Sequence, residues 1–177
     1  MKTISETSII DASPETVFRY VDDIRNTGWH MTESSMPLMG SKLQLEVLSE
    51  KPFGEGVMYR WHGKVIGFTL DLTEVVTKWI ADKEKVWGTV GDPRLIIMSN
   101  YEMRLLLEPV GGQTKLTFGI TYDLPKSAFW KVIGWLLAGW YSRWCLKNMS
   151  KDTKNALEGV SAQMHLAGPQ GKGIGRG

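Results

Sequence analysis

Glu74 is the residue whose position raises the first chemical question. It continues the apolar alternation of Phe68, Leu70 and Leu72. In strict two-residue register it points to the same covered face, where desolvation raises the pKa of a carboxyl and makes it a candidate general acid or base. In the alternative, a β-bulge at Val75–Val76 turns the side chain outward or an arginine pairs with it, because one slip in register reverses the face. We favour this alternative.

The other residue types that support catalysis or metal binding are not spaced for either role. His30, His62 and His165 lack the spacing of metal ligands, and His62 lies in the polar register of its strand. Cys145 falls on the predicted sheet-facing side of a helix, where a buried thiol is normally inert. We therefore expect no metal and no cofactor, assign no catalytic residue, and favour a protein that is not an enzyme.

Residues 130–146, WKVIGWLLAGWYSRWCL, hold four of the eight tryptophans. Only eleven residues, Val132 to Ser142, separate Lys131 from Arg143. A transmembrane helix needs about 20 mostly apolar residues, so we expect no membrane span. On a helical wheel one narrow stripe, which we assign to the sheet-facing side, contains Ala138, Ser142, Cys145, Met149, Ala156 and Val160. The opposite side contains Phe129, Ile133, Leu136, Leu137, Trp140 and Trp144, and further along it turns basic.

The apolar side of this helix has more than one interpretation. We favour burial, either under the segment Trp29–Leu38 or in a homodimer formed through the Trp140 face, because a helix that is apolar on all sides is usually buried. The alternative is a peripheral contact with a membrane, since tryptophan beside lysine suits the headgroup boundary of a bilayer.

The elements that must position these residues follow from periodicity. An opening strand is predicted over residues 3–11, and Ser13 and Pro14 then predict a helix start. From residue 41 to 124 the period changes to two, with apolar alternation at 43–47, 57–65, 68–72, 101–107 and 116–122. This pattern predicts an antiparallel sheet with one covered face. After Pro125, a helix of about 30 residues is expected to end near Gly159.

The composition fits one globular domain, with 177 residues of which 42% are hydrophobic and 23% charged. We place this domain at residues 1–160 and a flexible, glycine-rich basic tail at 161–177. The N-terminus lacks an apolar signal segment and a single cysteine excludes an intramolecular disulfide, so we expect a cytoplasmic protein. Residues 126–177 carry eight Lys/Arg against two Asp/Glu, which we assign to a solvated helix face, and no nucleic-acid partner is expected.

Three segments resemble parts of a known superfamily. DASPETVFRYVDDIRNTGWH (11–30) resembles its strand-to-helix opening, GKVIGFTLDLTEVV (63–76) its central strands, and GGQTKLTFGITYDLP (111–125) its last strand. Over residues 3–158 the chain is similar to the START-like (SRPBCC) superfamily, in its polyketide cyclase/dehydrase and lipid-transport group. The resemblance implies an α+β helix-grip fold, in which a curved antiparallel sheet wraps around a long C-terminal helix and two short helices follow the first strand.

The resemblance also implies a hydrophobic cavity between sheet and helix. Members bind lipids, sterols, hormones or polyketide-like molecules, and a minority are enzymes. If the strand faces look inward, the ligand-binding residues are Tyr59, Trp61, Phe68, Leu70, Glu74, Tyr101, Met103, Phe118 and Tyr122. The alternative is that these side chains fill a solid core.

We predict that the protein binds or transports a small hydrophobic ligand, a lipid or a polyketide-like molecule. A second hypothesis is a cyclase or dehydratase that acts on a polyketide-like substrate through Glu74, His62 or a cavity tyrosine. A third is an interaction or membrane-surface module that uses the Trp-rich helix.

Overall fold

The computed structural model describes residues 1–28, 42–65 and 67–166. Within these residues seven strands form one antiparallel sheet in the order β1-β7-β6-β5-β4-β3-β2. In chain order the elements are β1 (Lys2–Ile10), α1 (Pro14–Asp22), α2 (Ile24–Thr27), β2 (Lys42–Val47), β3 (Met58–Val65), β4 (Phe68–Ile80), β5 (Glu84–Arg94), β6 (Tyr101–Val110), β7 (Gln113–Tyr122) and α4 (Ala128–Leu166).

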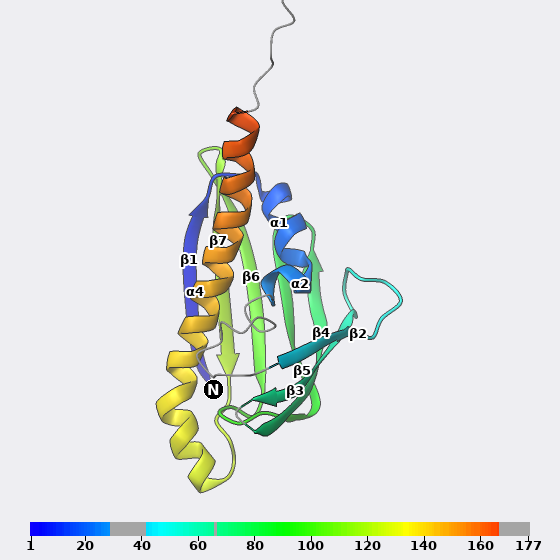
Figure 1. Cartoon of the computed structure of the whole chain (residues 1–177), viewed down its shortest axis with the longest axis vertical. Helices are drawn as coiled ribbons and strands as arrows, with labels where there is room; N and C mark the ends of the chain where they lie inside the picture. Colours follow the sequence, from blue (N-terminus) through cyan, green and yellow to red (C-terminus); the bar gives the residue numbers. More distant parts are fainter. Residues whose placement is uncertain (29–41, 66, 167–177) are drawn as a thin grey trace, which may run out of the picture.

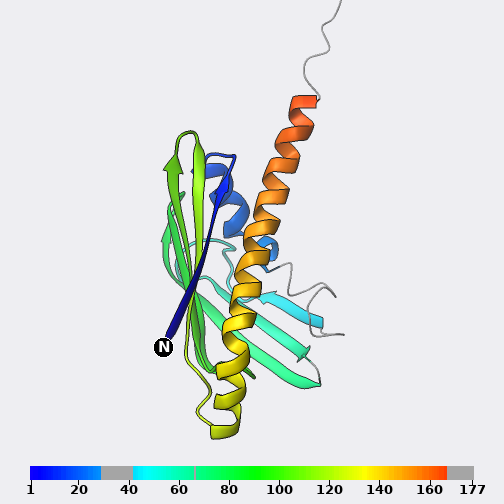
Figure 2. The same ribbon diagram turned by 90° about the vertical axis from the view of Figure 1, so that its left-hand side faces the viewer.

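The curved sheet and the long helix α4 together define the architecture. Figures 1 and 2 show α4 running along the sheet, where it contacts β1 and β7. Strands such as β7 alternate buried and half-buried residues, so one face of the sheet is covered, as the two-residue period predicts. The expected α+β helix-grip fold is confirmed.

Two short helices follow β1, and their caps explain where they begin. The Ser13 hydroxyl accepts a hydrogen bond from the Thr16 amide, and Pro14 occupies the first turn of α1. The side chain of Asp23 accepts from the Arg25 amide and starts α2. The break at Asp23 separates α1 from α2, although the apolar residues Val17, Val21 and Ile24 continue at helical spacing across it. The segment Trp29–Leu38 lies outside the described residues.

Helices α1 and α2 lie between α4 and the sheet. Both contact α4, and α1 also contacts β6 and β7 (Figure 2). The inward residues Val17, Phe18 and Val21 of α1 are buried. The two helices therefore act as a wedge that keeps α4 away from the strands at one end of the molecule.

A buried ion pair attaches this wedge to the sheet. Lys85 of β5 and Asp22 of α1 have side chains that are 2% and 7% exposed, and Nζ lies 2.7 Å from the carboxylate Oδ1. Nζ also donates to the Asp22 carbonyl oxygen at 2.7 Å, while the Trp79 indole N–H donates to Oδ2 at 3.0 Å. The rings of Tyr59 and Trp87 lie 5.5 and 5.6 Å from the ammonium. A buried charge needs partners of this kind to offset lost hydration.

The sheet-facing stripe of α4 matches the prediction in part. Ala138, Ser142 and Met149 are buried as expected, whereas Cys145 and Ala156 are half-buried; the side chain of Val160 lies outside the description. The helix continues to Leu166, past the expected end near Gly159. A glycine inside a helix lowers helix stability by about 1 kcal/mol relative to alanine, and the helical turns on either side of Gly159 tolerate this loss.

The opposite side of α4 is largely exposed; because Trp29–Leu38 lies outside the described residues, its burial by that segment or by a second subunit stays a prediction. Of its six predicted residues, Phe129, Leu136, Leu137 and Trp140 are 48–68% exposed, whereas Ile133 and Trp144 are half-buried. The sheet cannot cover this side, because α4 already presents the opposite stripe to it.

Gly134 permits close packing near the start of α4. A Cβ added there would lie 2.4 Å from the Ile97 carbonyl oxygen and 2.9 Å from the Pro125 Cδ. We expect Gly134→Ala to lower the free energy of unfolding by about 1–3 kcal/mol, because a backbone atom must move. The matched control is Gly159→Ala in the same helix, where nothing lies within 4 Å. That variant should gain about 0.5–1 kcal/mol in urea denaturation; equal effects of the two substitutions would contradict this account.

The ion pair gives a second prediction. We expect Lys85→Met to lower the free energy of unfolding by about 3–5 kcal/mol, because the Asp22 carboxylate is left buried without its cation. Adding Asp22→Asn, which keeps an acceptor for Trp79, should recover much of this loss in a double-mutant cycle. The exposed Arg19–Glu15 pair is the control, and Arg19→Met should cost below about 0.5 kcal/mol.

Candidate ligand-binding site

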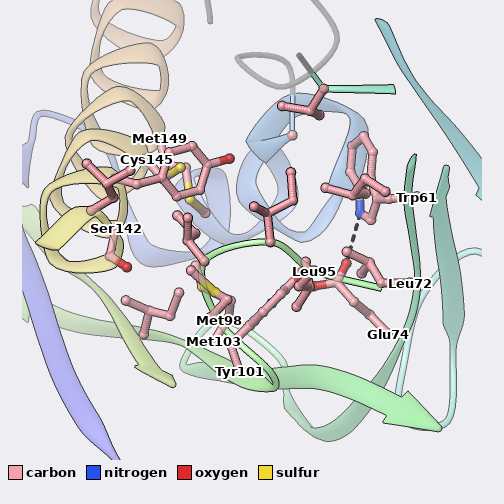
Figure 3. A pocket seen from close by; sticks show the side chains of 18 of the residues that line it. Trp61, Leu72, Glu74, Leu95, Met98, Tyr101, Met103, Ser142, Cys145 and Met149 are labelled. Carbon is pink, nitrogen blue, oxygen red and sulfur yellow. Dashed lines mark hydrogen bonds between the residues drawn. The ribbon is translucent and has the colours of Figure 1, made fainter. Parts of the chain in front are cut away.

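A cavity of about 360 Å³ lies between the sheet, α2, the loop at residues 95–98 and the first half of α4. Its wall is mainly apolar. The sheet contributes Trp61, Leu70, Leu72, Met103 and Ile120, the loop contributes Leu95, Ile96, Ile97 and Met98, and α4 contributes Ile133, Leu137, Trp140, Cys145 and Met149. Figure 3 shows side chains from sheet and helix facing each other across this space.

Glu74 lies in the cavity wall and is 2% exposed, so the outward orientation that we favoured is wrong. The Trp61 indole N–H donates to Oε2 at 2.9 Å, as Figure 3 shows, and the Tyr101 hydroxyl donates to Oε1 at 2.8 Å. The register of β4 against β5 shifts twice, between Asp71 and Thr73 and between Val76 and Lys78, but the alternation of buried residues is unbroken from Leu70 to Val76. Glu74 therefore keeps the inward direction of Leu70 and Leu72.

Burial controls the protonation of the titratable groups in this wall. Desolvation raises the pKa of Glu74, although hydrogen bonds from Tyr101 and Trp61 and the charge of Lys85 oppose the shift. Burial likewise raises the pKa of Tyr101 and Tyr141 well above the ordinary value, and that of Cys145 to about 12. These phenols and this thiol are therefore neutral at physiological pH.

Six of the nine residues predicted to line the cavity do so: Trp61, Phe68, Leu70, Glu74, Tyr101 and Met103. Tyr59, Phe118 and Tyr122 are buried but do not line it. Tyr59 packs beside Lys85 under α1. Phe118 and Tyr122 belong to β7, which α4 contacts directly, so they fill the interface between helix and sheet.

Several wall residues were missed from the sequence. Leu95–Met98 form an apolar run directly after Asp92-Pro93, and such a run in a loop was an available signal, because loops are normally polar. Gly28 also lines the cavity, and a Cβ there would lie 2.5 Å from the Trp61 ring. Lys85, which is buried but does not line the cavity, was missed as well, although it shares the inward register of Trp87.

The mouth of the cavity is marked by lining residues that remain exposed. Phe68, at the start of β4, is 48% exposed, and Leu137 and Trp140 of α4 are 48% and 52% exposed. The rings of Phe68 and Trp130 meet edge to face, with centroids 5.6 Å apart. The mouth therefore opens between the β3–β4 hairpin and the first turns of α4.

Other kinds of site find no support in the part of the chain that is described. Across residues 1–28, 42–65 and 67–166, no three His, Cys, Asp or Glu side chains gather as metal ligands. Over the same ranges, no helix is both long and apolar enough to cross a membrane. His62 is half-buried and does not line the cavity.

Glu74 gives a prediction about pH. An unfolded carboxyl ionises near the ordinary value of 4.5, while the folded protein keeps the proton to higher pH. The stability that this group contributes is thus complete below about pH 4.5 and is lost as pH rises through the folded pKa, by at most about 1.4 kcal/mol per pH unit. Glu74→Gln mimics the protonated carboxyl and should abolish this loss.

The measurement is urea denaturation of wild type and Glu74→Gln between about pH 4.5 and 8. The wild type should lose stability relative to the variant as pH rises. The exposed Glu102→Gln controls for removal of a carboxylate elsewhere. A difference between wild type and Glu74→Gln that stays constant over this range would show that Glu74 has an ordinary pKa.

Comparisons with known proteins agree with this geometry. A profile of the family "Polyketide cyclase / dehydrase and lipid transport" matches residues 1–153. Among solved structures, the protein TTHA0849 from Thermus thermophilus is similar with a TM-score of 0.63 and 20% identity, covering 90% of this chain and 99% of that chain. A START superfamily protein from Mycobacterium smegmatis has a TM-score of 0.60 and 17% identity, covering 89% and 98%.

A third similar structure, the Aha1 dimer from Colwellia psychrerythraea in solution, has a TM-score of 0.52 and 20% identity, covering 89% of this chain and 97% of that chain. At these identities the likeness shows the fold alone. A comparison with curated sequences gives no match. The family profile, however, covers most of the sequence, and the chain therefore belongs to the polyketide cyclase/dehydrase and lipid-transport family.

Proposed function

We propose that the protein binds, and thereby carries, one small and mainly apolar molecule in the cavity between sheet and α4. The observation that carries this proposal is the cavity itself, with about 360 Å³ of space and an almost wholly apolar wall. That volume falls at the lower end of the range for small-molecule sites, about 300–1,000 Å³. Family membership supports the same function, since the family description includes lipid transport.

The wall favours a neutral ligand over an anionic one. Among the lining residues that the structure describes there is no Lys, Arg or His to pair with a carboxylate or phosphate. Lys85, the closest buried cation along β5, is already paired with Asp22. Desolvation raises the pKa of Glu74, and its carboxyl group can exchange a hydrogen bond with a hydroxyl or carbonyl group of a ligand. We therefore propose a ligand with an apolar body and at most a hydroxyl or carbonyl group.

The enzyme alternative, a cyclase or dehydratase, would use Glu74 as a general acid. Such chemistry also needs a base within reach of the substrate. Burial keeps Tyr101, Tyr141 and Cys145 protonated, so they do not supply one. Binding is thus the better supported function.

We also propose a cytoplasmic location, where the free Cys145 stays reduced.

The direct test is native mass spectrometry of the purified protein followed by organic extraction, which should release a neutral apolar molecule. In parallel, the neutral fluorescent probe N-phenyl-1-naphthylamine should bind at least about tenfold more tightly than its anionic relative anilinonaphthalene sulfonate, because the cavity lacks a cation. Met103→Trp, which fills the cavity, should weaken probe binding by about tenfold or more. Met58→Trp, on β3 outside the cavity, is the matched control.

Thermal unfolding shows whether Met103→Trp is folded. A folded Met103→Trp variant that binds the probe as tightly as wild type would contradict the proposed site.

A further inference from the structure

The first turns of α4 expose a continuous apolar surface. We call it the aromatic face; its residues are Phe129, Val132, Trp135, Leu136, Leu137 and Trp140, which are 48–68% exposed. Spacings of three and four residues along a helix place most of them on one side. A surface with this many large apolar side chains usually marks a contact site.

The charged residues around the aromatic face are basic. From Lys126 to Lys151 the sequence contains no Asp or Glu, and the first acidic residue is Asp152. Exposed Arg143 and Lys147 continue the same side of the helix beyond Trp140. On the flank, Lys2 Nζ lies 5.7 Å from the centroid of the Trp135 ring. The complementary partner is therefore apolar at its centre and anionic at its border.

The aromatic face is continuous with the mouth of the cavity. Leu137 and Trp140 belong to both, since they line the cavity and are about half exposed. Figure 2 shows the first turns of α4 at the same end of the molecule as the β3–β4 hairpin, whose Phe68 forms the other side of the mouth. Any partner that covers this face thus also lies against the opening.

We infer that the aromatic face docks on an anionic lipid bilayer, with the cavity mouth turned toward the lipid. Tryptophan, phenylalanine and leucine enter the boundary between headgroups and acyl chains, and Arg143 and Lys147 contact the anionic headgroups. A second copy of the chain fits less well, because two such faces would bring cations together around their contact. The docking inference rests on the aromatic face alone. The further step, in which a ligand passes from the bilayer into the cavity without crossing water, also rests on the proposed function.

The test is co-sedimentation of the full chain with phosphatidylcholine vesicles, with and without about one quarter phosphatidylglycerol. Wild type should bind the anionic vesicles, and binding should weaken as salt is raised. Val132→Glu with Leu136→Glu should reduce binding by about tenfold or more, because both carboxylates would have to enter the bilayer boundary. Neither residue lines the cavity.

The matched control is Leu48→Glu with Val110→Glu, the same substitutions at residues that are each 46% exposed outside α4; it should bind vesicles like wild type. Arg143→Glu with Lys147→Glu should lose the preference for anionic vesicles. Binding of N-phenyl-1-naphthylamine in solution should be unchanged in Val132→Glu/Leu136→Glu, which separates loss of docking from loss of the cavity.

Three outcomes would overturn the inference. The first is vesicle binding by Val132→Glu/Leu136→Glu at the wild-type level, and the second is no binding by wild type at all. The third is a wild-type dimer in analytical ultracentrifugation that these substitutions convert to monomer, which would assign the face to a second copy.

Discussion

The ion pair between Lys85 and Asp22 fixes the spacing between α1 and the sheet, and the rest of the interior depends on that spacing. Lys85 lies under α1, and its charge is balanced by the Asp22 carboxylate, a carbonyl oxygen and two aromatic rings. Because α1 and α2 contact α4, they set how closely the long helix approaches the strands. Beyond the wedge, side chains no longer fill the distance between helix and sheet, and the cavity occupies it.

The buried acidic groups of the interior are paired, whereas the Ser142 hydroxyl in the cavity wall has no hydrogen-bond partner among the described residues. Glu74 uses its oxygens for Trp61 and Tyr101, and Asp22 uses its own for Lys85 and Trp79. An unpaired buried polar group costs about 1–3 kcal/mol, so each such pairing removes a reason for water to enter. The hydrophobic character of the site therefore depends on well-placed polar residues as much as on apolar ones.

The fold was predictable from the sequence because its signals are local. The alternation of residues along β7 indicates a strand, and the Ser13-Pro14 cap indicates the start of α1; each signal involves only residues close together in the sequence. The direction of the Glu74 side chain was not predictable, because it depends on how β4 pairs with β5, and that register shifts between Asp71 and Thr73 and again between Val76 and Lys78. The pairing of Lys85 with Asp22 joins residues 63 positions apart and leaves no local pattern. Exposure of Trp140 was also beyond prediction, since it depends on what covers the helix rather than on the helix itself.

The order of the strands has a consequence for biosynthesis. β1 is made first, yet its partner is β7, with Lys2 opposite Tyr122. At about 5–20 residues per second, a ribosome needs about 6–24 s to make the intervening chain. During that time the β1 edge has no partner within the sheet, while β2 to β7 can pair with their neighbours in sequence as they emerge. Pairing of β1 with β7 is thus a late, long-range event, and helix α4 can cover the interior only after this pairing has formed.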